Sequence, residues 1–122
     1  MDLKMKSPAK GFSRLWHASR YSWQGLIAGL RTEAALRQEV IGLLVLLPIA
    51  LWVDVTRAER ALLIASLFAV LIVELLNTAI EVVVDRVGEE YHALSGKAKD
   101  LASAAVLFSL IAACAVWVII LW

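Results

Sequence analysis

Polar side chains recur on one face of an otherwise apolar stretch, residues 73–86, which reads V-E-L-L-N-T-A-I-E-V-V-V-D-R. They comprise two glutamates, an asparagine, a threonine and an aspartate: Glu74, Asn77, Thr78, Glu81 and Asp85. A spacing of i, i+3, i+4, i+7 and i+11 confines them to roughly 100° of arc on an α-helix. Carboxylates and an amide gathered in this way can accept a proton, bind a cation or orient a substrate.

The depth of these side chains favours a functional role. If residues 61–84 cross a bilayer, each carboxylate near the hydrocarbon costs on the order of 2.5 kcal/mol or more unless it is paired, protonated or metal-bound. The alternative is that the polar groups only hydrogen-bond between membrane helices. One such group would suffice for that, whereas Glu74 and Glu81 lie one heptad apart on the same face as Asn77.

The two glutamates are suited to different tasks. A rise of about 10 Å separates them on a helix, so Glu81 lies near the headgroups and Glu74 lies deeper. Together with Glu33, Glu81 could hold Mg²⁺, which favours one or two carboxylates plus nucleotide phosphates. Glu74 is placed to accept a proton from the hydroxyl of a membrane-dissolved substrate.

Basic side chains could face phosphate oxygens, as phosphoryl transfer requires. The candidates are Arg14, His92, Lys97 and Lys99. This signal is weak, because a K-x-K pair beside a membrane span is more often a determinant of topology. The glycine-rich phosphate-binding motifs G-x-x-x-x-G-K-[ST] and G-x-G-x-x-G do not occur.

Composition places the chain among membrane proteins. Of its 122 residues 61% are hydrophobic, mean hydropathy is +0.79 and net charge is +1. The charge gives no support for nucleic-acid binding. With Cys114 as the only cysteine, neither an intrachain disulfide nor a cysteine metal cluster is expected. The basic N-terminal segment lacks the apolar core of a signal peptide, so we expect the spans themselves to direct insertion.

The patterns predict an all-α membrane protein with a single domain, residues 1–122. Tail and surface helix occupy residues 1–30, where Trp, Tyr and Arg side chains suit the headgroup layer. We expect this amphipathic helix to end near Gly25 and Gly29. Three transmembrane helices follow, at residues 31–53, 57–87 and 94–122, and the first of them accommodates Pro48.

Lysine and arginine counts predict the orientation. Residues 1–39 hold seven, residues 54–60 two and residues 86–99 three. By the positive-inside rule the N-terminus and the second connection are cytoplasmic. Glu33 and Glu81 then lie on the side of the membrane where nucleotides are.

Six segments carry a resemblance to a known family: G-F-S-R (11–14), Y-S-W-Q-G-L (21–26), E-A-A-L-R-Q-E (33–39), residues 73–86, E-Y-H-A-L-S-G-K-A-K-D (90–100) and S-A-A-V-L (103–107). The chain resembles the prokaryotic integral-membrane diacylglycerol kinases, which include the undecaprenol kinases of Gram-positive bacteria. The resemblance implies a homotrimer with active sites between neighbouring subunits. It also implies transfer of the ATP γ-phosphate to the primary hydroxyl of a membrane lipid.

Position by position, the resemblance implies a role for each matching residue. Glu74 matches the general base, and Glu33 and Glu81 match the carboxylates that bind Mg²⁺. Positions that match ATP contacts are Arg14, Tyr21, Glu33, Asn77, Glu81, Glu90, Tyr91, His92, Lys99 and Asp100. Positions that match the lipid site are Arg14, Trp23, Glu39, Glu74 and Ser103.

The sequence thus favours a diacylglycerol kinase that forms phosphatidic acid at the cytoplasmic face of the bacterial inner membrane. Within the family the alternative is an undecaprenol kinase. Testing diacylglycerol and undecaprenol as substrates distinguishes the two. A different class is a small proton-coupled exporter that uses Glu74 as its proton site; it predicts pH-driven efflux without ATP. A structural adaptor predicts that Glu74, Asn77 and Glu81 can all become leucine without functional loss.

Overall fold

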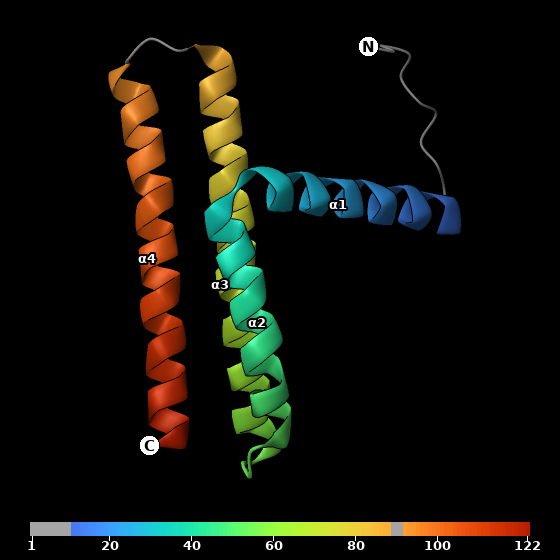
Figure 1. Ribbon diagram of the computed structural model, residues 1–122, viewed down its shortest axis with the longest axis vertical. Helices are drawn as coiled ribbons and strands as arrows, with labels where there is room; N and C mark the ends of the chain where they lie inside the picture. Colours follow the sequence, from blue (N-terminus) through green and yellow to red (C-terminus); the bar gives the residue numbers. More distant parts are fainter. Residues whose placement is uncertain (1–10, 89–91) are drawn as a thin grey trace. The chain divides into compact units, whose positions relative to one another are not determined.

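The computed structural model describes residues 11–88 and 92–122, and these ranges form four helices: α1 (Phe12–Thr32), α2 (Ala34–Trp52), α3 (Arg57–Val87) and α4 (Ala93–Leu121) (Figure 1). Helices α2, α3 and α4 are long and apolar enough to cross a membrane. In the described ranges, the prediction of an all-helical fold with three helices able to span a membrane is therefore confirmed. Helix α1 and the α2–α4 bundle are separate compact units, and each is described by itself.

Helix α1 is longer than predicted. It continues through Gly25 and Gly29 and ends at Thr32, two residues after the predicted boundary at residue 30. A glycine inside a helix costs only about 1 kcal/mol, and the residues around these two are good helix formers. The helix ends before Glu33, whose backbone is extended at φ −116° and ψ 113°. Residues 31–32, expected in the first span, thus belong to α1.

A tight turn reverses the chain between α2 and α3. Thr56 and Glu59 form a capping box at the start of α3, in which each side chain accepts a hydrogen bond from the other residue's backbone N–H. Arg60 Nη1 donates to the backbone oxygen of Ala50, 2.7 Å away, near the end of α2. Pro48 lies inside α2, which continues past it.

Helix α3 is the centre of the bundle. It packs against both α2 and α4, whereas in the described ranges no Cα atom of α2 comes within 8 Å of one in α4. The buried residues of α3 are Leu63, Leu67, Val70 and Glu74, spaced four, three and four apart. This heptad spacing is typical of a helix-packing seam. The same register continues through two half-buried residues, so we define the α3 seam as Leu63, Leu67, Val70, Glu74, Asn77 and Glu81.

Two polar contacts join α3 to α4, one toward each end. Trp117 Nε1 donates to Ser66 Oγ at 3.0 Å. At the other end Lys99 Nζ and Asp85 Oδ1 form an ion pair at 2.7 Å. His92 caps the start of α4, where its Nδ1 accepts a hydrogen bond from the backbone N–H of Leu94 at 3.1 Å.

Much of the apolar surface of α2–α4 is exposed on the single chain. In the most apolar stretch of α4, 0% of the residues are buried. Without water to drive apolar surfaces together, such a surface suits contact with lipid tails or with other membrane helices.

Candidate active site

The site is built around a carboxylate at a core position of α3. Glu74 is only 5% exposed, and it occupies the seam position where a fourth apolar residue would continue the packing of Leu63, Leu67 and Val70. A buried carboxylate costs free energy that leucine would not, so Glu74 is a candidate functional residue.

An amide connects this carboxylate to the next one along the seam. Asn77 Nδ2 lies 3.5 Å from Glu74 Oε1 and 3.4 Å from Glu81 Oε1. Residues three and four apart are neighbours on a helix, so Asn77 can reach both side chains at once. The structure thus brings together three of the predicted site residues.

A third carboxylate approaches from α2. Glu39 is half-buried, and its carboxylate lies near that of Glu74. Glu39 also borders a groove, so the polar cluster on α3 and the groove lie close to each other.

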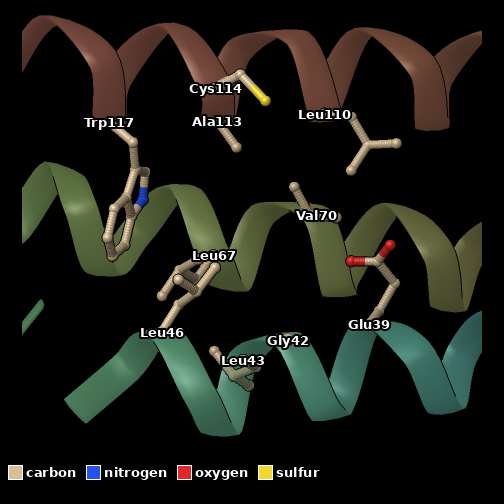
Figure 2. A pocket seen from close by; sticks show the side chains of 10 residues that line it. All are labelled: Glu39, Gly42, Leu43, Leu46, Leu67, Val70, Leu110, Ala113, Cys114 and Trp117. Atoms are coloured by element: carbon tan, nitrogen blue, oxygen red, sulfur yellow. The ribbon is translucent and has the colours of Figure 1, made fainter. Parts of the chain in front are cut away.

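The groove has a volume of about 260 Å³ and is lined by α2, α3 and α4. Figure 2 shows Glu39 at one end of it and Trp117 at the other. Apart from Glu39 the lining is mainly apolar: Gly42, Leu43, Leu46, Leu67, Val70, Leu110, Ala113, Cys114 and Trp117. An apolar groove with one ionisable end suits an amphiphilic ligand such as a lipid.

Three of the four predicted phosphate-binding residues, His92, Lys97 and Lys99, lie at the start of α4. Lys99 pairs with Asp85 of α3, and both side chains are exposed. Asp100 and Lys97 lie beside a separate hollow with Ala93, Gly96 and Leu101. Lys99 and Asp100, matched together to ATP contacts, therefore have different surroundings.

The candidate metal carboxylates are Glu33 and Glu81. Glu33 precedes α2 in the N-cap position, yet its side chain makes no capping hydrogen bond. Among the described residues no three His, Cys, Asp or Glu side chains are grouped to hold a metal ion. Two carboxylates still fit the few protein ligands that Mg²⁺ takes when it binds with a nucleotide.

The other predicted residues fall into three groups. Arg14, Tyr21 and Trp23 lie on α1, where the rings of Tyr21 and His17 stack with centroids 6.5 Å apart. Ser103 is exposed on α4. Two predicted ATP contacts lie outside the described residues: Glu90 and Tyr91.

Sequence reasoning missed the groove and the bond between Ser66 and Trp117. The only signal was spacing, since Glu39, Gly42 and Leu46 share one face of α2 and Leu110, Cys114 and Trp117 share one face of α4. Such spacing does not say which faces of two helices meet.

Comparison with known proteins matches nearly the whole chain. A family model described as prokaryotic diacylglycerol kinase matches residues 20–121. The chain is 52% identical over 118 residues to a diacylglycerol kinase of Escherichia coli (strain K12), covering 97% of each chain. It is 49% identical to the Pseudomonas aeruginosa diacylglycerol kinase, covering 94% of this chain and 96% of the relative. For the Haemophilus influenzae diacylglycerol kinase the identity is 41%, with 88% and 91% covered.

Proposed function

Because this chain belongs to the prokaryotic diacylglycerol kinase family, we propose that it transfers the γ-phosphate of ATP to the primary hydroxyl of diacylglycerol. The product is phosphatidic acid. The observation that carries the proposal is Glu74, a carboxylate buried in an apolar packing seam and close to an apolar groove. A water-soluble substrate does not need its proton acceptor at such a depth, whereas a lipid alcohol does.

In the proposed step Glu74 takes the proton of the lipid hydroxyl as the hydroxyl oxygen bonds to the γ-phosphorus. The bond between the γ-phosphorus and the β–γ bridging oxygen breaks, and ADP leaves. Mg²⁺ would neutralise charge on the phosphates, and Glu33 and Glu81 are the residues that would hold it. Lys99 adds positive charge once it exchanges Asp85 for a phosphate oxygen. Protein groups in such a reaction mostly position and neutralise.

We assign the acyl part of the substrate to the groove, with its hydroxyl end toward Glu39 and Glu74. Gly42 supports this assignment because a Cβ there would meet nothing within 4 Å. Gly42→Leu should therefore fill part of the groove and raise KM for the lipid while KM for ATP stays unchanged. A lipid KM equal to that of the wild type would contradict the assignment.

The assembly we propose is a homotrimer in the bacterial inner membrane. Its N-terminus is cytoplasmic, and α1 lies as an amphipathic helix in the headgroup layer of the membrane. Active sites shared between subunits would let Arg14, Tyr21 and Trp23 of α1 contribute to ATP and lipid contacts. The exposed apolar surface of α2–α4 supports this assembly, because such a surface can be covered by other copies of the chain or by lipid. Cross-linking in native membranes tests the subunit number.

The central experiment is phosphorylation in mixed micelles. Purified protein, Mg²⁺ and labelled ATP are supplied with diacylglycerol or with undecaprenol. We expect labelled phosphatidic acid and little polyprenyl phosphate, because the compared relatives are all named diacylglycerol kinase. Preference for undecaprenol would identify the chain as an undecaprenol kinase. Absence of both products would refute the proposal of a lipid kinase.

A further inference from the structure

Asn77 makes a contact that the proposed reaction has not yet used. Its Nδ2 lies within 3.5 Å of Glu74 Oε1 and 3.4 Å of Glu81 Oε1, one carboxylate on each side along the helix. An amide nitrogen carries two hydrogens and can serve both acceptors at once. The two carboxylates thereby share one neutral donor.

These contacts favour one orientation of the amide. Asn77 Oδ1 is buried, and none of the residues that the structure describes provides it with a hydrogen-bond partner. Rotating the amide by 180° would set this oxygen against two carboxylates, which are acceptors as well. Leaving this buried oxygen without a hydrogen bond costs free energy. The side chain keeps this orientation because its nitrogen then faces both carboxylates.

Glu74 and Glu81 need such a connection. Both are long and flexible, and as like charges they repel each other. Glu74 is buried, whereas Glu81 is only half-buried and lies one heptad closer to the end of α3. Without a donor between them, repulsion would turn Glu81 toward solvent and leave Glu74 free to change rotamer.

We propose that Asn77 is a positioning residue that holds the proton acceptor Glu74 and the nucleotide-side carboxylate Glu81 in one fixed arrangement. This inference rests on the proposed kinase function. It differs from the role that the family resemblance implies, which is a direct contact with ATP. A nucleotide contact acts on KM for ATP, whereas a positioning residue acts on kcat.

The test compares variants at Asn77 in the full-length protein. Asn77→Asp keeps the shape but replaces the donor by an acceptor, and Asn77→Ser removes the amide without adding charge. Misplacing a catalytic group by about 1 Å can cost about 100-fold, so we expect both variants to lose about 100-fold in kcat, with a much smaller change in KM for ATP through Glu81. Asn77→Gln retains an amide and should recover part of the rate. The control is Ser109→Ala, since the Ser109 hydroxyl donates to the backbone oxygen of Val106 and lies outside the proposed site.

A second readout does not depend on turnover. Asn77→Asp would place three carboxylates together where the described residues contain no such group. More carboxylates strengthen divalent-cation binding, so Mn²⁺ titration without nucleotide, followed by electron paramagnetic resonance, should show tighter binding than in the wild type. A loss of fold alone would weaken this binding.

The outcomes distinguish a failure of the positioning role of Asn77 from a failure of the proposed kinase function. A raised KM for ATP at normal kcat would show that Asn77 contacts the nucleotide and would overturn the inference, as would wild-type kcat in Asn77→Ser. Should Asn77→Asp fail to assemble, the kcat of Asn77→Ser decides. An inactive wild-type protein would instead refute the proposed function, and Mn²⁺ binding would still report whether the three side chains converge.

Discussion

The two halves of the α3 seam have the same spacing and opposite chemistry. In the first half Leu63, Leu67 and Val70 are buried against neighbouring helices. In the second half Glu74, Asn77 and Glu81 continue the register with polar side chains. The first half of the α3 seam therefore packs the bundle, and the second half presents the polar side chains of the candidate site. Substitutions in the first half should affect stability, and substitutions in the second half should affect turnover.

The largest expected effect is that of Glu74→Gln. The amide has the shape of the carboxylate but cannot accept the hydroxyl proton, and a general base contributes about 10²- to 10⁴-fold. We expect kcat to fall by that factor. Stability to unfolding should be unchanged or higher, since a buried neutral group costs less than a buried charge. Normal turnover by this variant would remove Glu74 from the mechanism.

In the apolar half, Leu63→Ala should lower the free energy of unfolding and leave kcat unchanged. Leu63 is 0% exposed, so its truncation leaves a cavity, and we expect a loss of about 2 kcal/mol in unfolding free energy. The kcat of the folded fraction should stay at the wild-type value. Unfolding in increasing SDS measures the first quantity and the micelle assay the second. Val82, 60% exposed on the same helix, provides the control Val82→Ala with a change under about 0.5 kcal/mol.

The difference between the two halves of the α3 seam could be predicted from the sequence, because both halves follow helical spacing. Long apolar runs predicted the three spans, and the positions of Glu74, Asn77 and Glu81 predicted their shared face. The end of α1 was not predictable from Gly25 and Gly29, because a small propensity cost does not decide where a helix stops.

The groove and the contact between Ser66 and Trp117 were beyond prediction for a different reason. These two residues are 51 positions apart, and the groove takes its lining from three helices. Spacing within one helix says which residues share a face. It does not fix the rotation or axial offset of a neighbouring helix, which depends on how side chains of both helices interlock.

A smaller effect is expected from Trp117→Phe, which removes the hydrogen bond to Ser66 and preserves most of the ring. Ser66 Oγ still donates to the backbone oxygen of Leu63, 2.8 Å away, so no donor on Ser66 is left unpaired. Hydrogen bonds between membrane helices average about 0.6 kcal/mol, and we expect a loss of that size in SDS unfolding with kcat unchanged. Trp122→Phe, at a fully exposed ring, is the control. A large fall in kcat would show that the apolar half also positions the reactive groups.

The smallest effect tests the ion pair that follows the polar half of the α3 seam. Lys99 is paired with Asp85, and this pair must break if Lys99 is to meet a phosphate. Exposed ion pairs are weak, so Asp85→Asn should lower KM for ATP only by about twofold, with kcat unchanged. Asp54→Asn, an exposed aspartate before α3, is the matched control. A raised KM in Asp85→Asn would instead show that Asp85 orients Lys99 toward the nucleotide, so that the polar half works as one preorganised unit up to the end of α3.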